Sequence, residues 1–133
     1  MLSNITSMAL HGLDGYAVSV QVDVSAGMPC FEIVGLPDTS IKESKERVKT
    51  AIKNSGIEFF SRRVVINLAP ATTKKEGSIF DLPIAIGILI AMEEVNKNKA
   101  NKILDKTIVI GELSLRWKGL QSKWSITYLH RSC

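Results

Sequence analysis

The stretch YAVSVQVDV (residues 16–24) decides the fold of this chain. A valine occupies every second position from residue 18 onward, and small or polar residues stand between them. This period of two predicts a β-strand that buries one face and exposes the other. Residues 5–10 form a second candidate strand, and the Leu-Asp-Gly turn at 13–15 predicts that the two strands pair as a hairpin.

A third strand is predicted at residues 30–34, followed by an amphipathic helix at 39–55. Ser40 and Glu43 fit a capping box at the start of this helix, and Asp38 is a competing cap. The mixed charge outside its apolar stripe is typical of a solvated face, with contact to DNA as the alternative reading. The lysines of this candidate exposed face are Lys42, Lys45, Lys49 and Lys53.

The second half of the chain continues with a strand at 62–68 and a polar loop at 69–77. A second helix is predicted at 79–95, with Pro83 in its first turn, where a missing N–H is tolerated. This helix is apolar nearly all round, so it must be covered on more than one side. The remaining segments are a polar connector at 96–106 and a strand at 107–110.

The resulting order β-β-β-α-β-α-β predicts an α+β fold, a split β/α sandwich. The longest apolar run, residues 82–92, is too short to cross a bilayer, so no membrane partner is expected. Two cysteines without a CxxC pair suit a reducing cytoplasm.

The net charge of +4 is concentrated at one end of the chain. Residues 1–115 hold 13 Lys or Arg and 13 Asp or Glu, which cancel. Residues 116–133 add four basic residues and no acid, together with both tryptophans. The basic isoelectric point therefore says nothing about a basic face on the folded part.

The chain lacks the motifs of several catalytic classes. There is no GxxxxGKS or GxxxxGKT run to hold nucleotide phosphates, so no cofactor is expected in this chain. His11 and His130 are far apart in sequence and have no neighbouring Cys/His cluster, so a metal site is not predicted. The apolar run that ends at Glu93 and Glu94 is read as a helix, not as a magnesium-binding strand.

The polar loop before the second helix is the candidate interaction loop. Ser78 could serve as a nucleophile if a basic side chain approached it. The preferred alternative makes Ser78 the N-cap of the second helix, with Asp81 completing a capping box. The candidate loop residues are Lys74, Lys75, Glu76, Gly77, Ser78 and Asp81.

Four stretches resemble one known family. They are FEIVGLPD (31–38), KESKERV (42–48), VINLAPA (65–71) and KEGSIFDLPIA (75–85). The family is the magnesium-chelatase-like, ComM-type group of bacterial AAA+ ATPases. Four long motifs in the same order make chance similarity untenable.

The resemblance implies a fold, a context and partners. The fold would be that of domain 2 of ribosomal protein S5, shared with the proteolytic domain of Lon. The chain would be the N-terminal domain of a cytoplasmic AAA+ motor that binds ATP and Mg and acts on DNA in branch migration. Its partners would be the AAA+ module and the neighbouring subunits of a hexamer, with DNA as a further candidate.

Comparison with Lon suggests a non-catalytic domain. Lon-type domains place the catalytic serine shortly after a Lys-Asp-Gly-Pro run. Aligned with residues 75–78, Ile79 falls where Lon has its nucleophile, and an isoleucine cannot attack a carbonyl. The displaced Ser78 is rotated by about 100° around the helix axis. Two alternatives stay open, a Lon-like Ser-Lys peptidase and a stand-alone S5-like binder of nucleic acid.

The end of the chain departs from the family. Residues 111–115 (GELSL) match it, and the segment that follows does not. We therefore expect an S5-like domain at 1–115 and a divergent basic tail at 116–133.

Overall fold

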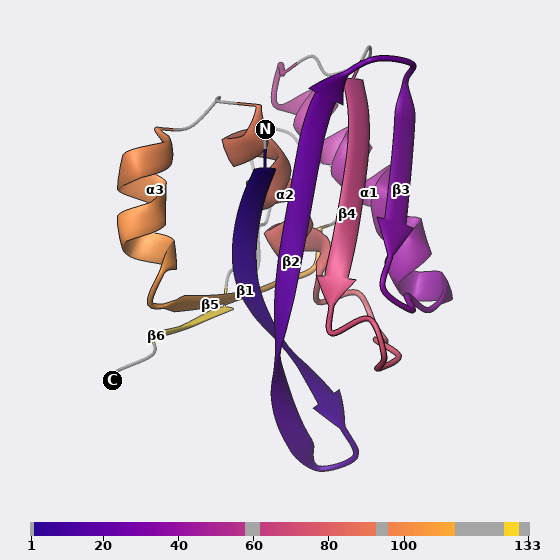
Figure 1. Cartoon of the computed structure of the whole chain (residues 1–133), viewed down its shortest axis with the longest axis vertical. Coiled ribbons are helices and arrows are strands. Elements are labelled where there is room, and N and C mark those ends of the chain that lie inside the picture. The colour runs from indigo at the N-terminus through magenta and orange to yellow at the C-terminus, as the bar shows by residue number, and fades with distance from the viewer. Residues whose placement is uncertain (1, 58–61, 93–95, 114–126, 131–133) are drawn as a thin grey trace.

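The computed structural model describes residues 2–57, 62–92, 96–113 and 127–130. Nine elements follow one another in these ranges (Figure 1). They are β1 (Leu2–His11), β2 (Asp14–Ala26), β3 (Cys30–Val34), α1 (Thr39–Asn54), β4 (Arg62–Ala69), α2 (Asp81–Ala91), α3 (Lys97–Leu104), β5 (Thr107–Ile110) and β6 (Thr127–His130).

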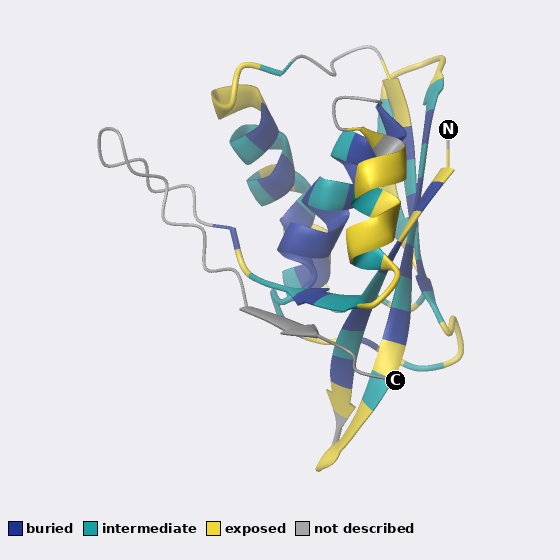
Figure 2. Ribbon diagram, turned by 90° about the vertical axis from the view of Figure 1, so that its left-hand side faces the viewer, coloured by how far each residue is buried: buried dark blue, intermediate teal, exposed yellow. Residues whose placement is uncertain are grey.

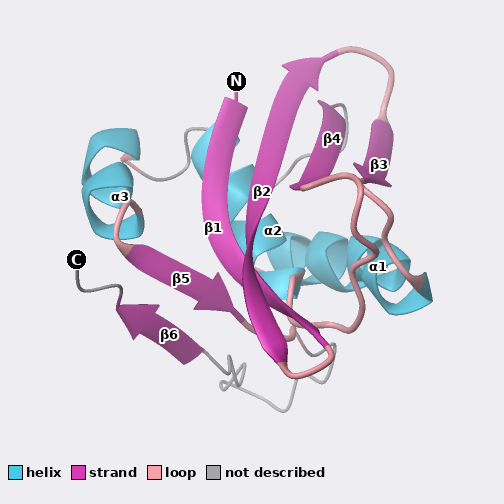
Figure 3. Ribbon diagram, turned by 60° about the horizontal axis from the view of Figure 1, so that its bottom comes forward, coloured by secondary structure: helices cyan, strands magenta, loops and turns pink. Residues whose placement is uncertain are grey.

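A mixed four-stranded sheet forms one layer of the molecule, in the order β1-β2-β4-β3. β2 pairs antiparallel with both β1 and β4, whereas β3 and β4 run parallel. A parallel pair needs a crossover connection, and α1 supplies it. β5 and β6 form a separate two-stranded antiparallel sheet (Figure 3). The predicted α+β class is confirmed.

The helices α1 and α2 cover one face of the four-stranded sheet (Figure 2). The four alternating valines of β2 point into this layer and are buried. α2 contacts β1, β2, α1 and β5. It is therefore covered on more than one side, as its apolar composition predicts. Within the described ranges, no helix is long and apolar enough to cross a membrane.

The opposite face of the sheet carries polar side chains that are half-buried or exposed. Asn67 donates to Gln21 across β4 and β2 at 3.0 Å, and Ser19 donates to Asn4 across β2 and β1 at 2.5 Å. Cross-strand pairs of this kind stabilise a sheet modestly and leave the face wettable. The alternation predicted for β2 is thus confirmed on both faces.

The first helix begins where the sequence predicts, with the alternative cap in use. The Asp38 carboxylate accepts a hydrogen bond of 2.8 Å from the backbone N–H of Ile41. Ser40 lies inside α1 and does not cap it. The i,i+4 pair between Glu43 and Arg47 forms at 3.7 Å.

The prediction for the second helix is wrong at its start. Residues 77–80 form turns, and α2 begins at Asp81 with Phe80 as an N-cap that makes no side-chain hydrogen bond. Ser78 is therefore not the cap. α2 ends at Ala91 with Met92 as its C-cap, whereas the predicted helix runs to residue 95; residues 93–95 lie outside the described ranges.

The predicted polar connector at 96–106 is also wrong, because it contains α3. Asn96 caps this helix by accepting a hydrogen bond of 3.1 Å from the backbone N–H of Lys99. Four residues of the predicted tail form β6, which pairs with β5. All other residues of the tail lie outside the described ranges.

Gly35, which follows β3, is fixed by a close approach to the next strand. Its φ is +105°, a conformation that side-chain-bearing residues rarely adopt. A Cβ placed there would lie 2.2 Å from the carbonyl oxygen of Leu68 in β4. Glycine is the residue that allows the chain to leave the sheet here.

We predict that Gly35→Ala destabilises the protein by more than about 3 kcal/mol, because a positive φ and a backbone clash add up. Gly56→Ala is the matched control, since its φ is +84° and nothing lies within 4 Å of the added Cβ. The control should cost about 1 kcal/mol. Denaturant unfolding followed by circular dichroism measures both, and equal losses would show that the contact with Leu68 is unimportant.

Candidate functional site

The predicted interaction loop is tied to the turn that follows β3. The backbone N–H of Lys75 donates to the carbonyl of Leu36 at 3.0 Å, and the N–H of Asp38 donates to the carbonyl of Lys75 at 3.1 Å. The Asp38 carboxylate also accepts a hydrogen bond of 3.0 Å from the N–H of Gly77. Asp38 therefore caps α1 and holds the loop against it.

Lys75 is fully buried, which the sequence analysis did not predict. Its ammonium donates to the carbonyl of Gly35 at 2.9 Å and to the carbonyl of Pro70. Burial lowers the pKa of Lys75 from its ordinary 10.5. Lys75 supports the loop from the inside and is not accessible to a partner. Its prediction as a contact residue is therefore wrong.

Asp81 is also fully buried, and it is a hub rather than a contact residue. Its carboxylate accepts hydrogen bonds from the Ser44 hydroxyl, from Nε of Arg47 at 2.6 Å and from the backbone N–H of Leu113 at 3.1 Å. It lies at the N-terminus of α2, where the helix dipole favours negative charge. Three separate segments of the chain meet at this carboxylate.

Arg47 completes the hub from the middle of α1. Its Nη2 donates to the Ser40 carbonyl at 2.8 Å and to the second carboxylate oxygen of Asp81 at 3.1 Å. The hydrogen bond to Asp81 raises the pKa of Arg47 above its ordinary value. Helical spacing pairs Arg47 with Glu43 at i,i+4, but no local pattern indicates Asp81, which is 34 residues away. The one sequence feature that points to a buried ion pair is Asp81 itself, an acidic residue at the start of an otherwise apolar helix.

The loop residues that remain accessible are Lys74 and Glu76, which are exposed, and Gly77 and Ser78, which are half-buried. The structure brings Lys75 to main-chain carbonyls, not to the Ser78 hydroxyl. Among the described residues, no group of three or more His, Cys, Asp or Glu lies close enough together to hold a metal ion.

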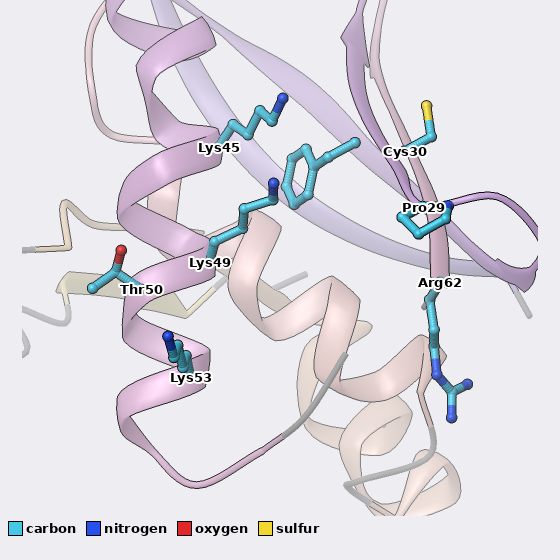
Figure 4. Close-up of a pocket in the computed structure, with 8 residues that line it drawn as sticks. Pro29, Cys30, Lys45, Lys49, Thr50, Lys53 and Arg62 are labelled. Carbon is cyan, nitrogen blue, oxygen red and sulfur yellow. The ribbon is translucent and has the colours of Figure 1, made fainter. Parts of the chain in front are cut away.

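Three of the four predicted helix lysines line a basic groove, a hollow of about 330 Å³ between α1 and the starts of β3 and β4 (Figure 4). Lys42 lies beside it, in an adjoining depression that shares Lys45 and Phe31. The helical spacing of these lysines is visible in the sequence, whereas the opposite wall comes from strands distant in the sequence. The residues of the basic groove are Pro29, Cys30, Phe31, Lys45, Lys49, Thr50, Lys53 and Arg62.

The sequence of this chain is similar to a known protein family and to several curated proteins. Residues 20–122 match the protein family described as subunit ChlI of Mg-chelatase. The chain is 44% identical over 114 residues to the uncharacterized protein YifB of Escherichia coli, which covers 86% of the chain and 22% of that relative. It is 42% identical over 95 residues to the competence protein ComM of Haemophilus influenzae, covering 71% of the chain and 19% of ComM. The chain thus spans about a fifth of the length of these relatives.

We predict that Asp81→Asn lowers the free energy of unfolding by about 3–5 kcal/mol, because it leaves the guanidinium of Arg47 without its buried counter-charge. Glu43→Gln is the control on the same arginine. It removes an exposed partner at 3.7 Å and should cost less than about 0.5 kcal/mol. Urea titrations measure both, and similar small losses would contradict the role of Asp81 as the hub.

The lowered pKa of Lys75 predicts a stability that rises with pH. Between the lowered pKa and 10.5 the unfolded chain binds more protons than the folded chain, so raising the pH through this window favours folding. A neutral amine still has two hydrogens to donate to its two carbonyl acceptors. Relative to Lys75→Met, the wild type should therefore gain stability as the pH rises toward 10.5. Denaturant titrations of the two proteins measure the difference, and a flat or falling difference would contradict the prediction.

Proposed function

The chain belongs to the family of the ChlI subunit of Mg-chelatase, and from this we propose that it is the N-terminal module of a bacterial AAA+ ATPase that processes DNA. The observation that carries the proposal is the pattern of the matches. Most of the chain aligns with about a fifth of each curated relative, one of which is named a competence protein. A chain that corresponds to one domain of a longer protein accounts for this partial coverage of the relatives.

In this proposal the module has no catalytic role of its own. The sequence lacks a phosphate-gripping glycine loop, so ATP and Mg would be held by the rest of the protein. When residues 75–78 are set against the Lys-Asp-Gly-Pro run of Lon, Ile79 falls at the position of the Lon nucleophile. Lys75 is engaged by the carbonyls of Gly35 and Pro70, which argues against its service as the base of a Ser-Lys peptidase.

The proposed fold is that of domain 2 of ribosomal protein S5. The parallel β3-α1-β4 crossover beside an antiparallel β1-β2 hairpin supports this assignment. A free-standing nucleic-acid binder of the same fold is less consistent with a relative of which the matched residues make up only 22%.

The module would act by contact, with neighbouring subunits of a cytoplasmic hexamer, with the ATPase ring or with DNA. Two surfaces are available for this. One is the exposed part of the loop, Lys74 and Glu76, and the other is the lysine-bearing side of α1. The loop is anchored to the half-buried carboxylate of Asp38 and α1 to the buried carboxylate of Asp81, so they present fixed rather than adaptable surfaces.

We predict that the chain binds DNA in a salt-sensitive way through its folded part. The four basic residues of the tail must first be neutralised, since they alone could bind DNA. Because β6 pairs with β5, substitution is preferable to deletion. The tail-neutral background carries Arg116→Gln, Lys118→Gln, Lys123→Gln and Arg131→Gln.

Fluorescence anisotropy with labelled single-stranded and branched DNA at about 50 and about 200 mM salt measures this binding. Affinity that survives in the tail-neutral background and falls by about tenfold or more between the two salts supports DNA contact. Affinity that disappears with the tail charges would contradict it.

A further inference from the structure

The basic groove has two walls that carry positively charged side chains, a feature that the proposed function does not require. One wall is α1, which contributes Lys45, Lys49 and Lys53. The other wall is made by residues 29–31, at the start of the edge strand β3, and by Arg62, the first residue of β4. Figure 4 shows the lysine-bearing helix facing Arg62 across the hollow.

The three lysines form a regular row. They are spaced at i, i+4 and i+8, so they lie on one side of α1 and successive residues are about 6 Å apart along the helix axis. Like charges at this spacing repel each other and destabilise a helix by a few tenths of a kcal/mol per pair. No acidic side chain lines this groove among the described residues. The repulsion between Lys45 and Lys49 opposes the helix, and an anion that enters the groove relieves it.

Phe31 orients the Lys49 ammonium but does not offer a surface on which a base could stack. The Lys49 ammonium lies 5.9 Å from the centre of the Phe31 ring, a cation–π distance. Phe31 is only 8% exposed, so its ring is too covered for a base to stack on it. Recognition here must therefore work through charge, and Arg62 adds a planar donor that suits phosphate oxygens.

The dimensions favour an extended polyanion over a single small anion. The row from Lys45 to Lys53 is about 12 Å long at 1.5 Å per residue. A nucleic-acid strand that rises about 3.4 Å per nucleotide would place roughly four phosphates along it. Because phosphate contacts carry no sequence information, the binding would be independent of sequence.

We propose that the basic groove is the site at which this module holds the sugar-phosphate backbone of a single nucleic-acid strand. This inference rests on the proposed function, and it commits that function to one surface, the α1–β3 groove, instead of the loop at Lys74. Lys45, Lys49 and Arg62 contact the phosphates, and the Phe31 floor positions Lys49.

The test uses a fluorescein-labelled oligothymidylate, a strand with little base stacking, and the tail-neutral chain. The groove variant carries Lys45→Gln, Lys49→Gln and Arg62→Gln. The matched control removes the same charge elsewhere, through Lys99→Gln and Lys102→Gln on α3 and Lys106→Gln after it, all exposed residues.

We expect the groove variant to bind at least about tenfold more weakly at about 50 mM salt. Its salt slope should fall by about 2, because three phosphate contacts on a single strand contribute about 0.7 each. The control should change affinity by less than about twofold. A charge-preserving pair, Lys45→Arg with Lys49→Arg, should retain binding, and thermal unfolding checks that each variant folds.

The remaining outcomes separate the inference from the proposed function. Equal losses in the groove variant and the control would overturn the groove and leave DNA contact standing. Binding that is unaffected in the groove variant and lost in Lys74→Gln would move the site to the loop. No binding by the tail-neutral chain would remove both the groove and DNA contact. Tighter binding of polyglutamate than of the oligonucleotide at equal charge concentration would identify an acidic peptide as the partner and overturn the inference.

Discussion

The burial of the Asp81 carboxylate is the constraint on which the rest of this structure depends. α2 is apolar nearly all round and must lie inside the molecule, and Asp81, its first residue, is buried with it. Removing an ionised carboxylate from water costs several kcal/mol unless charges and donors replace the lost hydration. The donors come from Ser44 and Arg47 on α1 and from the backbone of Leu113 after β5. Meeting that requirement fixes α1, α2 and the end of β5 relative to one another.

A second carboxylate, that of Asp38, fixes the start of α1. Asp38 caps the helix through Ile41 and at the same time binds the N–H of Gly77. Held at its start by Asp38 and at its middle by Arg47, the helix cannot turn about its axis. Ser44 and Arg47 face the hub, and Lys45, one residue beyond Ser44, lies about 100° further round and lines the groove. The buried ion pair thus determines which lysines are presented.

The sequence predicted what local periodicity controls and missed what distant contacts control. The five strands between residues 2 and 110 and α1 follow from alternating or helical patterns, and their existence is confirmed. The start of α2 was misplaced because Ser78 and Asp81 have capping-box spacing, whereas the Asp81 carboxylate is taken by α1. α3 was missed because it is short and mostly polar. Lys75 looked exposed because it sits in a polar run, and only the fold brings Gly35 and Pro70 to its ammonium.

The candidate site shows the same division. The lysine row is a local pattern and was predicted, but Arg62 and Phe31 belong to strands whose starts meet α1 only in the folded chain. The cations of this protein consequently fall into two groups with different energetics. Arg47 and Lys75 are satisfied within the fold and stabilise it. Lys45, Lys49 and Arg62 line a groove that has no acid in its described lining, so an anion that binds there relieves their mutual repulsion. By linkage, any polyanion held there stabilises the folded state as it binds, which joins the stability of α1 to the occupancy of the groove.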